Sequence, residues 1–340
     1  VLVIGPAWVG DMIMAHSLVR TLVDAGAQRV DVVAPGWSLP LLSRMPGVDD
    51  AIEMPLGHGR FGWSVRRRIG TGLRERRYSR AIVLPRSFKS ALVPFFAKIP
   101  VRVGYRGEFR YGLLTDVRHL DPDVLTGTVQ RYVALGSPAQ AFGAPSAPHP
   151  RIETDPVNQA GLLERLELDA GRPIVAMMPG AEYGPAKCWP IEHFRALAAT
   201  LVDRGYGVWV LGSERDRAAG AAMAAGSDGV VDLCGRTRLE DAVDLLALAD
   251  HAVTNDSGLM HVAAAVGTHV VAIYGSTTPA FTPPLTDRAS VFHLGLDCSP
   301  CFERECPLGH LRCLRDIRPS SVLEAIAASG ARDDGPPRSR

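Results

Sequence analysis

Short apolar runs alternate with longer helix-like stretches along this chain, and no other feature limits the possible folds as strongly. In the first half, each apolar run has the length of a buried strand, and the stretch after it has helical spacing. The expected strands are residues 1–5, 30–34, 51–54, 80–84 and 101–104, and the expected helices are residues 11–25, 38–45, 64–76 and 87–97. Because strands that are joined through helices pair in parallel, this half predicts a parallel sheet covered by helices.

A segment rich in Pro, Ala and Ser, residues 137–150, is interpreted as a linker, after which the same alternation starts again. The expected strands are then residues 174–178, 208–211, 230–233, 251–254 and 270–274, and the helices are residues 191–204, 214–225, 239–248, 258–266 and 320–328. We predict an α/β fold with two Rossmann-like, doubly wound domains, residues 1–150 and 151–330, because 340 residues exceed the usual size of one core. Ligands should bind at the carboxyl ends of the strands, in the cleft between the domains. Residues 331–340 are expected to form a disordered tail.

The composition is that of an ordinary globular protein, with 46% hydrophobic and 21% charged residues. No uncharged apolar run approaches the ~18–20 residues of a membrane helix. The apolar residues before Gly5 are too few for a signal peptide. We therefore expect a cytoplasmic protein, whose six cysteines are thiols or metal ligands rather than disulfides.

Charge is distributed unevenly along the chain. Residues 1–150 carry 19 Lys and Arg against 11 Asp and Glu, a net +8, whereas residues 151–340 carry 18 against 25, a net −7. Residues 60–118 alone carry 15 basic against 3 acidic residues. A salt-bridged, solvated face is the alternative, but too few acids lie nearby to pair with these arginines. The pattern favours a surface for phosphates and carboxylates, and we expect Arg66, Arg67 and Arg68 to contact an anionic acceptor or membrane.

The turn Asn255–His261 joins an expected strand to an expected helix. Asp256 and Ser257 suit a helix start, and Gly258 lets a ligand approach the backbone. The free N–H groups of such a start suit a phosphate, with ordinary capping as the alternative. His261, one turn into the helix, is either a phosphate or sugar contact or a packed histidine.

Lys187 lies in a Gly- and Pro-rich loop, residues 179–190, that follows another expected strand. A cation there can neutralise a pyrophosphate leaving group, and a solvated lysine is the alternative. The turns at residues 211–214 and 234–237 lie at the same sheet edge and could contact a ribose or a base, although capping explains each nearly as well.

Asp11 follows the first expected strand in the turn G-P-A-W-V-G-D, which lacks the G-x-G-x-x-G pattern of dinucleotide sites. It is either a general base for an acceptor hydroxyl or a residue that complements the helix dipole. The spacing does not separate these two roles.

Cys298, Cys301, Cys306 and Cys313 are spaced C-x2-C-x4-C-x6-C. One C-x-x-C pair followed by two single cysteines does not fit the two-plus-two zinc patterns well. We favour structural thiols and keep a structural zinc site as the alternative.

Four stretches together resemble the bacterial ADP-heptose:lipopolysaccharide heptosyltransferases, and the likeness extends over residues 1–328. They are Gly10-Asp11, P-G-A-E-Y-G-P-A-K-C-W-P, T-N-D-S-G-L-M-H and C-S-P-C-F-E-R-E-C-P-L-G-H, the last of which is most similar to the type II branch. The resemblance implies a GT-B fold, with the acceptor on the first domain and ADP-heptose on the second. It implies inverting transfer of L-glycero-D-manno-heptose to the first heptose of heptose-Kdo2-lipid A, at the inner face of the inner membrane. No cofactor and no nucleic-acid partner are expected.

The resemblance also implies roles for single residues. Asp11 is the catalytic base, Lys187 binds the diphosphate, and Asp256, Ser257, Gly258 and His261 contact the donor. The nucleotide site is lined at the positions of Glu182, Tyr183, Ser213 and Leu239. Related enzymes often carry hydroxyl residues at the positions of Glu182 and Tyr183, so this sequence departs from the family in that loop.

Three other functions are alternatives to this one. The first is a type I heptosyltransferase or another GT-B transferase, which tests of donor preference would separate. The second is a sugar-nucleotide-binding regulator, for which Asp11 would be dispensable. A nicotinamide oxidoreductase is disfavoured because the glycine pattern and an acidic ribose-binding residue after the first strand and helix are missing.

Overall fold

The computed structural model describes residues 1–57, 59–138 and 143–330, so the predicted tail at 331–340 and part of the predicted linker lie outside the described residues. The chain divides into two compact units, the first Val1–Glu153 and the second from Thr154 onward.

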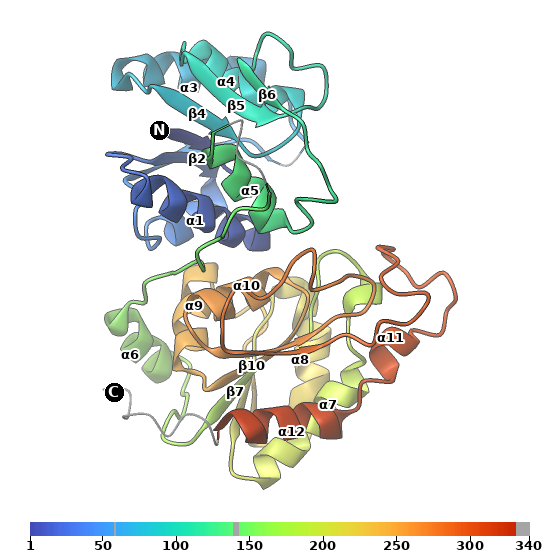
Figure 1. The fold of residues 1–340 in the computed structure, drawn as a ribbon. Coiled ribbons are helices and arrows are strands. Elements are labelled where there is room, and N and C mark those ends of the chain that lie inside the picture. Colours follow the sequence, from blue (N-terminus) through green and yellow to red (C-terminus); the bar gives the residue numbers. More distant parts are fainter. Residues whose placement is uncertain (58, 139–142, 331–340) are drawn as a thin grey trace. The chain divides into compact units, whose positions relative to one another are not determined.

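The first unit is a doubly wound parallel sheet, and among the described residues its strand order is β3-β2-β1-β4-β5-β6. The strands are β1 (Leu2–Ile4), β2 (Asp31–Pro35), β3 (Asp50–Met54), β4 (Arg80–Val83), β5 (Val101–Tyr105) and β6 (Asp116–Arg118). The helices are α1 (Val9–Asp24), η1 (Gly36–Ser38), α2 (Leu39–Leu42), α3 (Trp63–Gly72), η2 (Leu73–Arg76), η3 (Phe88–Ala91), α4 (Leu92–Phe96) and α5 (Thr128–Gly136). α3 packs with α4 on one side of the sheet and α1 with α5 on the other (Figure 1).

The second unit repeats this architecture, with the strand order β12-β11-β10-β7-β8-β9 among the described residues. The strands are β7 (Ile174–Met178), β8 (Gly207–Val210), β9 (Val230–Asp232), β10 (His251–Asn255), β11 (His269–Ile273) and β12 (Ala289–Phe292). The helices are α6 (Pro156–Arg165), η4 (Pro185–Lys187), α7 (Ile191–Asp203), η5 (Glu214–Asp216), α8 (Arg217–Ala224), α9 (Leu239–Leu248), α10 (Gly258–Ala265), α11 (Arg312–Arg315) and α12 (Pro319–Gly330). α7 packs against α8 and α12, whereas α9 packs against α6 and α10.

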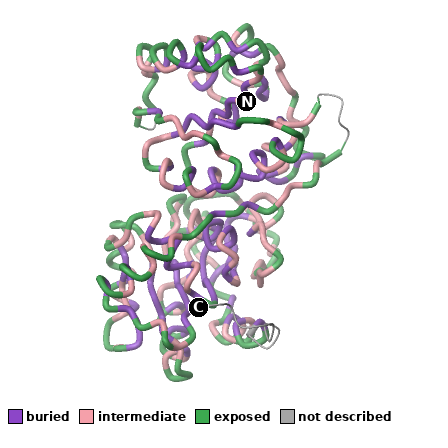
Figure 2. The backbone as a smooth tube through the Cα atoms, turned by 90° about the vertical axis from the view of Figure 1, so that its left-hand side faces the viewer, coloured by how far each residue is buried: buried purple, intermediate pink, exposed green. Residues whose placement is uncertain are grey.

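The central strands are apolar along their whole length because helices cover both faces of each sheet. All three residues of β1 and all five of β7 are buried. Buried residues gather in the interior of each unit (Figure 2). No helix in the described part of the chain combines the length and the apolarity needed to cross a membrane.

The predicted α/β class with two doubly wound parallel sheets is confirmed, and most boundaries agree to within one or two residues. The expected helix at 38–45 is shorter in the structure. The 3-10 turn η1 precedes α2, and α2 ends at Leu42. Among the described residues, six elements lie outside the prediction, namely the edge strands β6 and β12, the helices α5, α6 and α11, and the short 3-10 helix η4.

Candidate active site

In each sheet, successive strands are added outward in one direction and then outward in the opposite direction. At the point where the strand order reverses, the loops that follow the two neighbouring strands diverge. This point lies between β1 and β4 in the first unit and between β7 and β10 in the second. Ligands of doubly wound sheets bind beside the carboxyl ends of the strands at such a point. Asp11 follows β1, Lys187 follows β7 and Asp256 follows β10, so all three stand at these positions.

In the second unit, Lys187 and Asp256 form an ion pair, with 2.6 Å between Nζ and Oδ2. The hydroxyl of Thr277 also donates to Oδ2 of Asp256 at 2.6 Å, and the hydroxyl of Thr282 donates to Oδ1 at 3.1 Å. Both carboxylate oxygens are therefore engaged within the protein. Because of these contacts, Asp256 is suited to hold Lys187 in place and is poorly suited to bind a phosphate itself.

The loop that carries Lys187 is fixed by the cysteine-bearing segment. The backbone N–H of Ala186 donates to the carbonyl of Arg304 at 3.0 Å, and the hydroxyl of Tyr183 donates to the carbonyl of Phe302 at 2.5 Å. Gly184 has a φ of +154°, and a Cβ there would lie 2.6 Å from the carbonyl oxygen of Arg304. The close approach thus requires glycine. The Lys187 ammonium lies 5.0 Å from the centre of the Tyr183 ring, a cation–π contact.

The start of α10 has no side-chain cap, although helix capping was the alternative to phosphate binding in the interpretation of this turn. Ser257 is the N-cap residue with extended backbone, and its side chain makes no capping hydrogen bond. The carboxylate of Asp256 is turned to Lys187 and the two threonines. The first N–H groups of an uncapped helix remain available to an anion.

His261 is buried within α10, with 3% of its surface exposed. Burial lowers the pKa of His261 to about 4; the charge of Lys187 adds to this shift and that of Asp256 opposes it. The ring is therefore neutral at physiological pH. Its Nδ1 has no hydrogen-bond partner among the described residues, which leaves one polar atom for a ligand or a water.

The positions expected to line the nucleotide site fall on the same sheet edge. The hydroxyl of Ser213 donates to Asp216 at 2.8 Å, and a Cβ on Gly180 would collide with the Asp216 carboxylate, so the β7 and β8 loops lie together. Glu182 forms an exposed ion pair with Arg215, at 2.9 Å. Leu239 is the first residue of α9.

In the first unit, Asp11 lies in the first turn of α1, whose N-cap Trp8 makes no side-chain capping bond. The side chain of Asp11 accepts a hydrogen bond from the hydroxyl of Tyr132, on α5. Burial, the charge of Asp11 and this bond raise the pKa of Tyr132, so the phenol keeps its proton. Sequence reasoning missed Tyr132, which lies more than a hundred residues away on a helix that was not predicted.

Thr277 and Thr282 were missed as well, although a signal was present for Thr277. The expected strand at 270–274 is followed by the hydroxyl-rich run S-T-T at a strand end of the same sheet edge.

The expectation that Arg66, Arg67 and Arg68 share one exposed surface is wrong for Arg66. Arg66 is only 7% exposed, and its Nε donates to the carbonyl of Phe61 at 2.7 Å. Arg67 and Arg68 are exposed as expected. Burial lowers the pKa of Arg66, so the charged group itself is partly withdrawn from solvent.

The six cysteines are free thiols. Burial raises the pKa of Cys313, and Cys306, Cys298 and Cys301 add to this rise, so the four thiols share one neighbourhood. Backbone N–H groups, first that of Leu311, lower the pKa of Cys306. Within the described part of the chain, no three His, Cys, Asp or Glu side chains are arranged to hold a metal ion.

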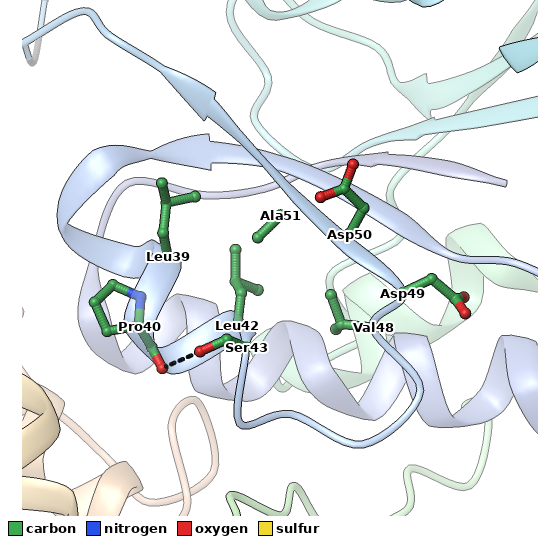
Figure 3. Close-up of a pocket in the computed structure, with 8 residues that line it drawn as sticks. All are labelled: Leu39, Pro40, Leu42, Ser43, Val48, Asp49, Asp50 and Ala51. Carbon is green, nitrogen blue, oxygen red and sulfur yellow. Dashed lines mark hydrogen bonds between the residues drawn. The ribbon is translucent and has the colours of Figure 1, made fainter.

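A pocket of about 550 Å³ lies elsewhere in the first unit, between α2 and the start of β3 (Figure 3). Its two acids are already engaged, because Asp49 accepts from the Val30 N–H at 2.7 Å and Asp50 pairs with Arg76 at 2.5 Å. It also lies at the amino end of β3, away from the edge that carries Asp11. The pocket is therefore not the site.

Comparison with known proteins decides the family. Residues 66–312 match the family model described as glycosyltransferase family 9 (heptosyltransferase). The chain belongs to glycosyltransferase family 9. Lipopolysaccharide heptosyltransferase 2 of Salmonella typhimurium is 47% identical to this family 9 glycosyltransferase, over 96% of the chain and 97% of the relative. Lipooligosaccharide heptosyltransferase 2 of Haemophilus influenzae is also 47% identical, over 96% and 98%.

Solved structures agree with this assignment. The ADP-heptose lps heptosyltransferase II of E. coli matches with a TM-score of 0.85 and 44% identity, over 98% of this chain and 99% of that one. A glycosyl transferase family 9 protein from Veillonella parvula has the same TM-score at 18% identity, which shows the fold alone. The family 9 enzyme therefore has the GT-B fold that the resemblance implied, and the predicted likeness to heptosyltransferase II is confirmed.

Proposed function

We propose that this glycosyltransferase moves L-glycero-D-manno-heptose from ADP-heptose to the first heptose of the lipopolysaccharide inner core, with inversion. The observation that carries the proposal is the Lys187–Asp256 pair beside the uncapped start of α10. A fixed cation and free helix N–H groups at a strand-end reversal suit the diphosphate of a sugar nucleotide. The names of the heptosyltransferase 2 relatives supply ADP-heptose as the donor and lipopolysaccharide as the acceptor.

The second unit binds the donor in this proposal. As the bond between C1 of heptose and the β-phosphate oxygen breaks, negative charge builds up on ADP. Lys187 and the positive end of the α10 dipole stabilise that charge, and Asp256 positions Lys187. Ser257 and Gly258 present the backbone N–H groups, and neutral His261 offers a hydrogen bond to a phosphate or sugar oxygen. Glu182, Tyr183, Ser213 and Leu239 line the nucleotide side.

The first unit binds the acceptor and supplies Asp11 as the base. Asp11 takes the proton from the acceptor hydroxyl as its oxygen forms the new bond to C1, so the proton ends on the carboxylate and the electron pair of the broken bond on ADP. Tyr132 positions the carboxylate through its hydrogen bond. The net basic charge of residues 1–150 suits an acceptor that carries phosphates and Kdo carboxylates.

We place the reaction at the cytoplasmic face of the inner membrane, where the six free thiols fit a reducing compartment. The residues assigned to this reaction need no cofactor to carry it out. A structural zinc on the four cysteines stays the less favoured alternative, and elemental analysis of untagged protein tests it.

Product analysis tests the proposal. The protein should convert ADP-heptose and heptose-Kdo2-lipid A into a product with a second heptose, and it should use neither UDP-sugars nor Kdo2-lipid A comparably. Preference for Kdo2-lipid A would indicate a type I enzyme, and donor binding without any transfer would indicate a regulator.

Lys187 provides a second test. Lys187→Ala should weaken ADP binding at least about tenfold in calorimetric titration, because a charge-assisted contact is lost. Lys187→Arg keeps the charge and should lose less. If folded Lys187→Ala binds ADP as the parent does, the diphosphate role is wrong.

A further inference from the structure

Five aromatic side chains form a continuous cluster in the first unit, which we call the aromatic ridge: Phe61, Trp63, Phe88, Phe95 and Phe96. The ring of Phe61 is stacked at 6.2 Å from Trp63 and at 6.4 Å from Phe88, between centroids. Trp63 meets Phe96 edge-on at 5.1 Å, and Phe96 meets Phe95 at 5.5 Å. The ridge therefore joins the start of α3 to η3 and α4.

Much of the ridge is open to solvent. Phe61 and Trp63 are each 48% exposed and Phe95 is 40% exposed. Phe109, 90% exposed, lies on a neighbouring loop that Glu108 ties to the backbone N–H of Phe88, at 2.7 Å. Single exposed apolar residues are ordinary, but a contiguous group of large rings marks an interaction surface.

The backbone beneath the ridge is held firmly. Buried Arg66 donates to the carbonyl of Phe61, and Arg74 donates to the carbonyl of Phe96 at 2.8 Å. Gly70 brings α3 close to α4, since a Cβ there would lie 2.5 Å from the carbonyl oxygen of Val93. The rings are thus presented in a preformed arrangement, which reduces the entropy lost on binding.

Basic side chains surround the ridge. Arg60 precedes Phe61, Arg67 lies one helical turn after Trp63, and the guanidinium of Arg102 lies 5.8 Å from the centre of the Phe95 ring. Arg68 and Lys98 are exposed in the same segments. Between residues 57 and 103 the sequence contains a single acid, Glu75. A partner for this surface must tolerate aromatic rings and carry negative charge.

We propose that the aromatic ridge is a membrane-docking surface, which inserts its exposed rings into the interfacial layer of a bilayer that contains anionic lipid. Aromatic rings favour the boundary between head groups and acyl chains, and flanking basic residues favour anionic head groups. A second copy of this chain fits less well, because a symmetric contact would bring two basic surfaces together. The inference deepens the proposed function, on which it rests for the lipid nature of the acceptor.

Vesicle flotation without sugar substrates tests the docking surface. The full chain should bind vesicles of phosphatidylglycerol and phosphatidylcholine, and the triple variant Phe61→Ser, Trp63→Ser, Phe95→Ser should bind at least about tenfold more weakly, since each ring loses a favourable apolar transfer. Trp37→Ser is the matched control, because Trp37 is also 40% exposed but lies on η1. Circular dichroism verifies that each variant is folded.

Depth of insertion gives a readout that simple charge attraction would not produce. Brominated acyl chains should quench tryptophan fluorescence of the parent and of Trp37→Phe, and much less that of Trp63→Phe. Arg67→Gln with Arg68→Gln should weaken binding to anionic vesicles and leave the residual binding to phosphatidylcholine unchanged.

Three results would overturn the inference: no vesicle binding by the parent, equal binding by the triple serine variant, or self-association of the parent that the triple variant abolishes. Because no turnover is involved, failure here is distinguishable from failure of the proposed function. Vesicle binding without heptose transfer would reject the proposed reaction and support the docking surface. Heptose transfer without vesicle binding would support the reaction and reject the docking surface.

Discussion

The hydrogen bond from Tyr132 to Asp11 determines how the carboxylate can act as a base. A donor to a carboxylate favours its ionised form and fixes its orientation, at some cost in basicity. A positioned base of this kind typically contributes ~10²–10⁴-fold to a rate.

Asp11→Asn retains the shape of the side chain and removes the base. We expect kcat to fall by roughly 10²–10⁴-fold while ADP affinity changes little, because the nucleotide contacts belong to the second unit. Steady-state kinetics and ADP titration measure the two effects. Near-parental kcat would reject Asp11 as the base.

Tyr132→Phe removes only the donated hydrogen bond. The Asp11 carboxylate then becomes easier to protonate, so the acidic limb of the pH–kcat profile should move to higher pH. Tyr111→Phe, at an exposed position, is the control and should leave the profile in place. If Tyr132→Phe changes thermal stability but leaves the acidic limb of the pH–kcat profile in place, Tyr132 has only a packing role.

Single residues show where sequence reasoning reached its limit. Asp11, Lys187 and Asp256 could be placed at strand ends because strand-end turns can be recognised locally. Tyr132 and Thr282 act through contacts across long sequence separations, which no local pattern encodes. Arg66 was misplaced for a related reason, since its burial depends on how α3 meets α4.

At the scale of elements, the buried central strands were all predicted, whereas the edge strands β6 and β12 were missed. β7 is a continuous apolar run, whereas β6 is three residues long, D-V-R, and depends on pairing with β5 and on the Arg118–Asp116 ion pair. α6 had a readable start, because Asp155 caps it and Pro156 follows. It was missed although this start was present, and only Leu162 of its ten residues is buried.

The contact of α3 with α4 depends on the missing side chain of Gly70. Gly70→Ala should lower the free energy of unfolding by about 1–3 kcal/mol, since the new Cβ would collide with the Val93 carbonyl and the Phe96 Cβ. Gly72→Ala, in the same helix with open space around it, should be neutral or stabilising by up to ~1 kcal/mol. Urea unfolding compares the two. If both variants change the free energy of unfolding equally, α3 and α4 can move apart to make room for the new Cβ at no cost.

At the scale of the whole molecule, two buried histidines make stability depend on pH. Burial lowers the pKa of His16, and burial lowers that of His261 to about 4 from its ordinary 6.5. The unfolded chain therefore binds more protons than the folded one between these values, and stability is lost as pH falls through this window.

Between pH 7.5 and 5 the contribution of His261 should fall by roughly 2 kcal/mol, at ~1.4 kcal/mol per unit of pKa shift. Urea unfolding at the two pH values measures the loss. His261→Gln should flatten the dependence, whereas His119→Gln, at an exposed position, should not. A parental difference that survives in His261→Gln would assign the effect to other groups.

The Lys187–Asp256 pair has a consequence for the end of the catalytic cycle. An ammonium without a resident counter-ion would hold ADP tightly after transfer and delay its departure. Asp256 competes with the product for Lys187, so Lys187 still has a counter-ion when ADP dissociates. Asp256→Asn should therefore bind ADP more tightly and, in stopped-flow displacement, release it more slowly than the parent. Unchanged or faster release would limit Asp256 to holding the loop in place.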